Sequence, residues 1–160
     1  MTLTIPDFSR LNVLVAGDAM LDEYWFGDTG RISPEAPVPV VRTKAAEQRA
    51  GGAANVALNV AALGAGTVLA AIVGQDERGQ VLSRVLEDRG VVCELVRSAA
   101  VPTIHKLRVL ARSQQLIRID AEQSLDSVAG DLTARFEALL SRADVAILSD
   151  YAKGTLTHVA

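Results

Sequence analysis

Residues 50–74, AGGAANVALNVAALGAGTVLAAIVG, are the stretch that most restricts the fold of this chain. A glycine pair, Gly51 and Gly52, precedes a segment that is apolar apart from two asparagines, the first of them Asn55. Glycine lets the backbone approach a neighbour closely, and the first amides of a helix have no partner within it. The stretch predicts a buried helix over residues 53–63. Its glycine pair serves either a hydroxyl-rich or anionic ligand or only a tight turn and close packing.

Short apolar runs alternate with amphipathic segments along much of the chain. Residues 11–16, 67–73 and 145–148 are predicted strands, and the first two are mostly apolar, which is typical of strands buried on both faces. Helices with an apolar stripe are predicted over residues 78–89 and 131–142. This alternation predicts a doubly wound α/β fold, with a mostly parallel sheet covered by helices on both faces.

Two segments interrupt the alternation. Residues 23–50 contain three spaced prolines, and residues 92–120 are expected to form successive strands with a turn near residues 112–114. Residues 115–120 alternate in polarity, as in a strand with one solvated face. We therefore expect a separate small β-sheet beside the main sheet.

Several classes of function are disfavoured by composition. The net charge is −3 and the basic residues form no stripe, which disfavours nucleic acid as a partner. A single cysteine, Cys93, and two distant histidines, His105 and His158, offer neither a disulfide framework nor a metal site. The N-terminus does not resemble a secretory signal, and no apolar run has membrane-spanning length. We expect a cytoplasmic protein that binds neither nucleic acid nor membrane.

Aspartates follow each of the three predicted strands. Asp18 and Asp22 follow the first strand, Asp76 follows the second, and Asp150 follows the third together with Lys153. Ligands of open α/β sheets bind beyond the carboxyl ends of the strands. Each aspartate could instead be a helix N-cap or a turn residue. Their convergence at one edge of the sheet nevertheless predicts a ligand site there.

Charged residues also line the predicted small sheet. Lys106 and Arg108 share one face of a strand, and Arg118 and Asp120 share a face of the next. They are either a solvated face with ordinary ion pairs or a cationic wall for a phosphorylated substrate, since guanidinium binds phosphate through two parallel hydrogen bonds. A dinucleotide fingerprint in the required context, a P-loop and a GxSxG elbow are all absent from the sequence.

With these residues in place, the chain resembles the ribokinase-like carbohydrate kinase family. AGGAANVA, Gly64 and Gly74 match the N-terminal signature of that family. Further segments are most similar to its heptose 7-phosphate kinases, either fused to a heptose 1-phosphate adenylyltransferase or free-standing: GDAMLDEYWFG, RISPEAPVPV, GGAANVALN, TIHKLRVLARSQQLIRID and LSDYAKG. The resemblance implies ATP- and Mg²⁺-dependent phosphorylation of D-glycero-β-D-manno-heptose 7-phosphate at its anomeric hydroxyl. The product is the 1,7-bisphosphate, on the route to ADP-heptose for lipopolysaccharide.

The resemblance also assigns roles to individual residues. It implies that Asp22 holds sugar hydroxyls, that Gly51 and Gly52 allow close approach, and that Asn55 hydrogen-bonds the sugar. Our own hypothesis adds five contacts to the phosphate or hydroxyls of the heptose: Lys106, Arg118, Asp120, Asp150 and Lys153. The β segments would form a lid, which in this family commonly serves as a homodimer interface.

One family motif does not occur in these 160 residues. It is the Asp-Thr-x-Gly-Ala-Gly-Asp run that carries the catalytic base and the anion hole for phosphoryl transfer. We therefore expect residues 1–160 to be the N-terminal, sugar-binding portion of a kinase domain. The catalytic base and most of the nucleotide site would lie beyond Ala160, and these residues alone would be inactive. Two alternatives stay open: a kinase for another sugar phosphate, of the fructose 1-phosphate or tagatose 6-phosphate type, or a fragment that only binds or dimerises.

Overall fold

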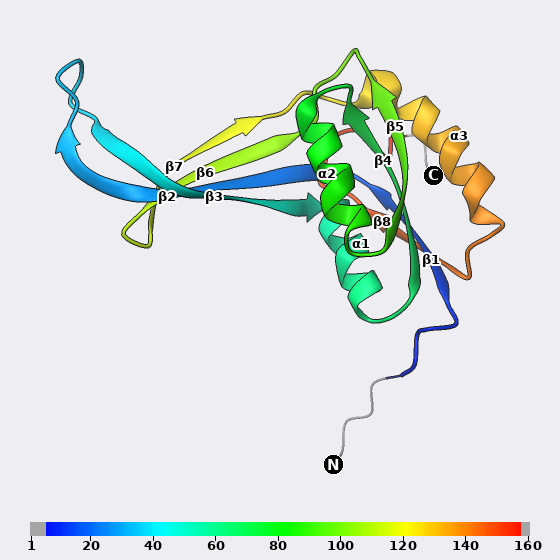
Figure 1. The fold of residues 1–160 in the computed structure, drawn as a ribbon. Helices are drawn as coiled ribbons and strands as arrows, with labels where there is room; N and C mark the ends of the chain where they lie inside the picture. The colour runs from blue at the N-terminus through cyan, green and yellow to red at the C-terminus, as the bar shows by residue number, and fades with distance from the viewer. Residues whose placement is uncertain (1–5, 158–160) are drawn as a thin grey trace.

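The structure is a computed structural model and describes residues 6–157. It contains two four-stranded sheets and three α-helices, which are arranged as a compact α/β body from which a long β-sheet extends (Figure 1). In chain order the elements are β1 (Asn12–Gly17), β2 (Ala19–Ile32), β3 (Pro39–Gly52), α1 (Ala53–Ala62), β4 (Gly66–Gly74), α2 (Glu77–Glu87), β5 (Val91–Ser98), β6 (His105–Ala111), β7 (Gln114–Ala121), the short 3₁₀ helix η1 (Asp126–Val128), α3 (Ala129–Leu140) and β8 (Val145–Ser149).

The main sheet, sheet A, has the strand order β5-β4-β1-β8, and all of its pairs are parallel. In the register at its centre, Val15 of β1 lies between Leu69 of β4 and Ile147 of β8. Successive residues of a strand point to opposite faces of a sheet, so a continuously apolar strand can feed two cores.

Two hydrophobic cores lie on the two faces of sheet A. Val13 and Val15 pack in the same core as the inner residues of α1 and α2, whereas Leu14 and Ala16 share the other core with Leu132 and other residues of α3. Helices therefore cover both faces of the sheet. The predicted doubly wound α/β fold is confirmed, and the predicted helices agree with α1, α2 and α3 to within two residues at each end.

The second sheet, sheet B, has the order β3-β2-β6-β7. Its strands β2 and β3 form a long antiparallel hairpin that projects from the body (Figure 1). Strand β6 pairs with β2 in parallel and with β7 in antiparallel fashion. The predicted turn near residues 112–114 is confirmed, since Arg112 and Ser113 have φ angles of 51° and 64°. The predicted small β-sheet is therefore present.

Sheet B differs from the prediction in its bounds and in its exposure. Strand β2 begins at Ala19, and residues 92–98 belong to β5, which pairs with β4 in sheet A. Among the described residues β5 pairs with β4 alone, so it is an edge strand of sheet A. Its side chains are therefore partly exposed, as they are in the strands of sheet B. Residues 114–120 are exposed along their whole length instead of having one buried face, because β7 is an edge strand that no layer of the described residues covers.

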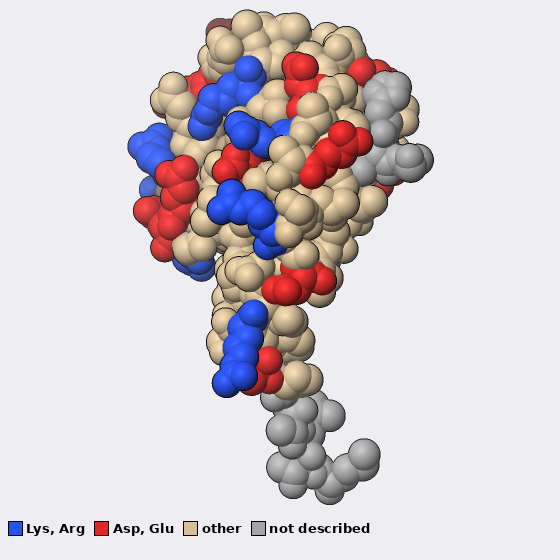
Figure 2. Space-filling view, turned by 90° about the vertical axis from the view of Figure 1, so that its right-hand side faces the viewer, with Lys and Arg blue, Asp and Glu red and all other residues tan. Residues whose placement is uncertain are grey.

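The side of the body that faces away from sheet B carries basic and acidic side chains that are interspersed (Figure 2). On that side neither sign of charge gathers into a large patch, in keeping with the small net charge of −3. Among residues 6–157, no helix is both long and apolar enough to span a bilayer.

Candidate functional site

The two sheets meet at the carboxyl end of β1. Only Asp18 separates β1 from β2, so the chain passes there directly from sheet A into sheet B. Gly17 at the end of β1 pairs with Ser149 at the end of β8. Strand β1 lies between β4 and β8, and such a switch in strand order is where open α/β sheets bind ligands.

Asp18 is fully buried and holds three segments together at this point. Its carboxylate accepts hydrogen bonds from the backbone amides of Tyr151 at 2.7 Å, Lys153 at 3.1 Å and Thr155 at 3.3 Å. Its backbone carbonyl accepts a hydrogen bond from the amide of Ala53, the first residue of α1, at 2.9 Å. Asp18 therefore fixes both the loop after β8 and the start of α1.

The glycine pair is required by two close approaches within the protein. Gly52 has a φ of +58°, and a β-carbon there would lie 2.2 Å from the backbone oxygen of Asp18. A β-carbon on Gly51 would lie 2.5 Å from Oδ2 of Asp22. The amide of Ala53, which has no partner within α1, donates its hydrogen bond to the Asp18 carbonyl and is therefore not available to a ligand. The pair thus serves the tight turn and also lets the Asp22 carboxylate lie against the backbone.

A cavity of about 590 Å³ opens between the end of sheet A and sheet B. Seven of the nine predicted site residues line it: Asp22, Gly51, Gly52, Asn55, Lys106, Arg118 and Lys153. Asp120 does not line this cavity but pairs with Lys106 and Arg118, which do. Asp150 lines an adjoining cavity of about 480 Å³, to which Lys153 also contributes. The structure therefore brings eight of the residues together and places Asp150 next to them.

The register of sheet B explains how the charged residues meet. Asp22 of β2 lies between Arg49 of β3 and Lys106 of β6, and Lys106 lies opposite Asp120 of β7. Two residues further along β2, Tyr24 lies beside Arg108, which in turn lies opposite Arg118 of β7. Since alternate residues of a strand share a face, both rows lie on the same side of sheet B. Strands distant in sequence thereby contribute to one wall of the cavity.

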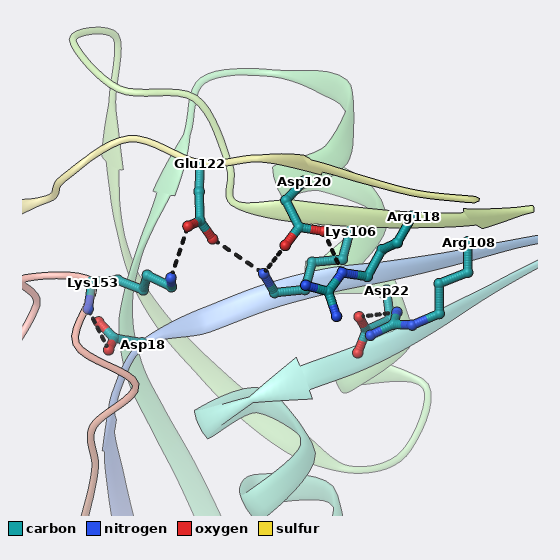
Figure 3. A network of polar contacts seen from close by, with 8 residues as sticks. All are labelled: Asp18, Asp22, Lys106, Arg108, Arg118, Asp120, Glu122 and Lys153. Atoms are coloured by element: carbon teal, nitrogen blue, oxygen red, sulfur yellow. Dashed lines mark hydrogen bonds and ion pairs between the residues drawn. The ribbon is translucent and has the colours of Figure 1, made fainter.

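Ion pairs connect most of these side chains (Figure 3). Arg108 Nη1 lies 2.6 Å from Asp22 Oδ1, and Arg118 Nε lies 2.9 Å from Asp120 Oδ1. Lys106 Nζ contacts both Asp120 Oδ2 at 2.9 Å and Glu122 Oε2 at 3.1 Å. The other oxygen of Glu122 contacts Lys153 Nζ at 2.9 Å. Glu122 therefore links sheet B to the loop after β8.

These contacts shift the pKa values of Glu122, Asp120 and Lys106 in the direction that favours their charged forms. Hydrogen bonds from Lys153 and Lys106 lower the pKa of Glu122, and a hydrogen bond from Lys106 lowers the pKa of Asp120. Burial acts to lower the pKa of Lys106, but the hydrogen bonds to Asp120 and Glu122 together outweigh it and raise that pKa. The wall of the cavity is thus a network of ions at neutral pH.

Other residues of the predicted edge have structural roles. Asp76 is the N-cap of α2, where its carboxylate accepts hydrogen bonds from the amide of Gly79 at 2.8 Å and from Thr103. Of the two roles left open for Asp76, the structure thus shows the helix N-cap, and its oxygens also hold Thr103 in the segment between β5 and β6. Asp150 accepts a hydrogen bond from the amide of Ala152 at 2.8 Å, as in a turn. Among residues 6–157, no three His, Cys, Asp or Glu side chains group as metal ligands, and His158 lies outside these residues.

Sequence reasoning placed Arg108 in the possible cationic wall but gave no role to five other residues that line the cavity: Met20, Tyr24, Arg49, Ala50 and Tyr151. The feature of the sequence that pointed to Arg108 was its place on the same strand face as Lys106. Arg49 becomes a neighbour of Asp22 only through the pairing of β2 with β3. That pairing spans a long hairpin with irregular register, which the sequence pattern did not reveal.

The family assignment follows from comparison with known proteins. The family model described as pfkB family carbohydrate kinase matches residues 10–158, and the chain belongs to this family. Solved structures agree in fold: a carbohydrate kinase from Agrobacterium tumefaciens has a TM-score of 0.66 and 21% identity, over 86% of this chain and 45% of that protein. Arabidopsis thaliana ribokinase complexed with ribose and ATP has a TM-score of 0.59 and 21% identity, with the same coverage.

Among curated relatives, the chain is 52% identical to the bifunctional protein HldE of Proteus mirabilis and 54% identical to that of Aeromonas hydrophila. Both matches extend over 99% of this chain but over 34% of the relative. The chain thus spans about a third of the length of the curated relatives that it matches.

Proposed function

We propose that these residues form the sugar-binding side of an ATP-dependent kinase that phosphorylates D-glycero-β-D-manno-heptose 7-phosphate at C1. The observation that carries the proposal is the cavity between the sheets, where Asp22, Asn55 and the glycine pair face a wall of cations. The identity of more than half of the residues with bifunctional HldE proteins supports heptose as the sugar.

The sugar end of the cavity suits a polyol. Asp22 provides carboxylate oxygens that accept hydrogen bonds from hydroxyls, and its Oδ1 is oriented by Arg108 at 2.6 Å. Asn55 projects from the first turn of α1 and can both donate and accept. Because a side chain at Gly51 would collide with Asp22, only glycine leaves this carboxylate in place beside the backbone.

The phosphoryl donor in this proposal is ATP with Mg²⁺, as the family assignment supports. The residues described here do not fit the whole donor complex, since no group of three potential metal ligands occurs among residues 6–157. We therefore assign no residue of this chain to the metal, and we propose that the nucleotide binds mostly outside residues 1–160. When bound, ATP supplies the phosphoryl group and Mg²⁺ offsets its charge.

We further propose a homodimer formed through sheet B, which acts as a lid. Large apolar side chains on this sheet are exposed, among them Trp25 (41%), Ile117 (52%) and Ile119 (48%). Exposed apolar residues that gather on one sheet are typical of interaction surfaces. Light scattering on the wild type and on Ile117→Asp tests this: a dimer that dissociates in the variant supports the interface, and a wild-type monomer contradicts it.

The activity is tested on the protein encoded by the full reading frame that contains this chain. ADP release is measured with heptose 7-phosphate, fructose 1-phosphate and tagatose 6-phosphate in parallel. The proposal requires the highest kcat/KM with heptose 7-phosphate and its loss in Asp22→Asn. Preference for either other sugar phosphate would contradict the proposed substrate. ADP release above background by residues 1–160 alone would contradict the proposed division of the site.

A further inference from the structure

The side chains that line the main cavity are strongly unbalanced in charge. Five are cationic, namely Arg49, Lys106, Arg108, Arg118 and Lys153, whereas Asp22 is the one carboxylate among the lining residues. The chain as a whole has a net charge of −3, so this excess is local. A cavity with such a lining attracts an anion.

The two lysines are already neutralised by neighbouring carboxylates. Lys106 contacts both Asp120 and Glu122, and its side chain is only 16% exposed. Lys153 contacts the second oxygen of Glu122. An ammonium group has three N–H donors, and in Lys106 two of them are engaged. Lys106 thus has little unused capacity to bind an incoming anion, and the ammonium group of Lys153 is held by Glu122.

The three arginines retain most of their donors. Each contacts one carboxylate: Arg108 contacts Asp22, Arg118 contacts Asp120, and Arg49 contacts Glu47. A guanidinium has five N–H donors in a planar fork that matches the oxygens of a phosphate. The Arg49 and Arg118 side chains are 56% and 53% exposed, so their free donors are accessible from the cavity mouth.

Tyr24 brings two of these arginines together. The Cζ of Arg49 lies 4.5 Å from the centre of the Tyr24 ring, and the Cζ of Arg108 lies 5.1 Å from it. Both guanidiniums are therefore held by cation–π contacts with one ring. Arg118 lies directly opposite Arg108 in the antiparallel pair of β6 and β7. Like charges in that position destabilise a sheet, and here Asp22 and Asp120 each offset one of the two arginines.

We propose that Arg49, Arg108 and Arg118, arranged around Tyr24, form the subsite for a phosphomonoester that the substrate already carries. The lysines complete the wall but are held by Glu122 and Asp120. This inference rests on the proposed function only in requiring a phosphorylated sugar, and it holds for any sugar phosphate that the cavity accepts. The dianion would place further negative charge beside Arg108 and Arg118, which lie directly opposite each other in the sheet.

The test uses Arg49→Gln and Arg118→Gln in the protein encoded by the full reading frame, because neither substitution removes a buried group. Arg42→Gln on the same strand β3 is the matched control, since Arg42 lines a different cavity. We measure KM and kcat for the sugar phosphate that is turned over, and for the same sugar without its phosphate. Binding of inorganic phosphate is measured separately by calorimetric titration.

We expect each substitution to raise KM for the sugar phosphate by about tenfold or more and to leave kcat and the unphosphorylated sugar nearly unchanged. Arg118→Lys, which keeps the charge but loses the fork, should recover part of the loss. Equal losses with both sugars, or an equal effect of Arg42→Gln, would overturn the inference. If heptose 7-phosphate is not turned over, the proposed function fails. In that case the titration decides: weaker binding of inorganic phosphate by the variants supports the subsite, and unchanged binding contradicts it.

Discussion

The buried carboxylate of Asp18 accepts a hydrogen bond from the backbone amide of Lys153 at 3.1 Å, although 135 positions separate the two residues in the sequence. The same oxygen accepts the amide of Tyr151 at 2.7 Å. Tyr151 and Lys153 both line the cavity, whereas Asp18 does not. Asp18 therefore fixes the positions of two cavity residues from outside the cavity. It is a positioning residue, and its role is to join the end of β1 to the loop that follows β8.

Replacing Asp18 by Asn tests this role through stability. The carboxamide offers one acceptor oxygen, and its NH₂ group must then face a backbone N–H donor. We expect the free energy of unfolding, measured by urea denaturation, to fall by about 2–3 kcal/mol, as for other buried hydrogen bonds to a charged group. Asp150→Asn is the control, because Asp150 is exposed and accepts only the amide of Ala152. Equal losses in the two variants would contradict a special role for Asp18.

Three glycines separate backbone strain from steric clash. Gly52→Ala introduces both, since φ is +58° and the new β-carbon would lie 2.2 Å from the Asp18 oxygen, and we expect a loss of about 3 kcal/mol or more. Gly64→Ala introduces strain alone, because φ is +93° with no atom within 4 Å, and should cost about 1 kcal/mol.

At Gly130 we expect the same substitution to increase stability instead of decreasing it. It lies in α3 without a positive φ and with open space around it, so Gly130→Ala should stabilise the protein by up to about 1 kcal/mol. Thermal unfolding of the three variants gives the order. A Gly52→Ala variant as stable as Gly64→Ala would show that the β1–α1 junction can relax.

Glu122 should make stability depend on pH. Hydrogen bonds from Lys153 and Lys106 lower its pKa in the folded state below the ordinary 4.5, so its contribution is present above that value and is lost as the pH falls through the folded pKa. We expect Glu122→Gln to reduce the free energy of unfolding at pH 7 by only about 0.5 kcal/mol, because solvent screens these partly exposed ions. The difference from wild type should shrink as the pH falls below 4.5 through the folded pKa, and it should also shrink in high salt.

The control for this variant is Glu35→Gln, since Glu35 lies in the exposed loop between β2 and β3. Urea denaturation at each pH provides the free energies. A difference between wild type and Glu122→Gln that does not change as the pH is lowered would show that the Glu122 carboxylate is not the group responsible.

Cys93 should react slowly with thiol reagents in the folded protein. Burial, followed by the charge of Glu87, raises the pKa of its thiol to about 11, so the reactive thiolate is scarce at neutral pH. Modification by a disulfide reagent should become faster with pH and should speed up by about tenfold or more when the chain is unfolded in urea. A rate in the native protein equal to that in urea would place Cys93 at the surface instead.

The relation between sequence and structure differs between the two sheets. In sheet A the strands β1, β4 and β8 are largely apolar runs and the helices have apolar stripes, so these strands and the three helices were predictable from pattern alone. In sheet B the strands are exposed and mixed in polarity, and β5 looks like one of them although it pairs with β4. A local hydrophobic pattern arises from burial. Strands β5 and β7 lie at the edges of their sheets and are little buried, so their sequences carry little of that pattern.

Residue pattern alone was enough to predict the doubly wound class, the glycine pair before α1 and the family motifs that extend to LSDYAKG. It did not determine that Asp18 is a buried anchor while Asp76 caps α2, since both are aspartates after apolar strands. Nor did it predict that Arg49 and Arg108 stack on Tyr24. Those relationships depend on strand pairing and register between distant segments, which the long-range packing of the chain decides and no local pattern encodes.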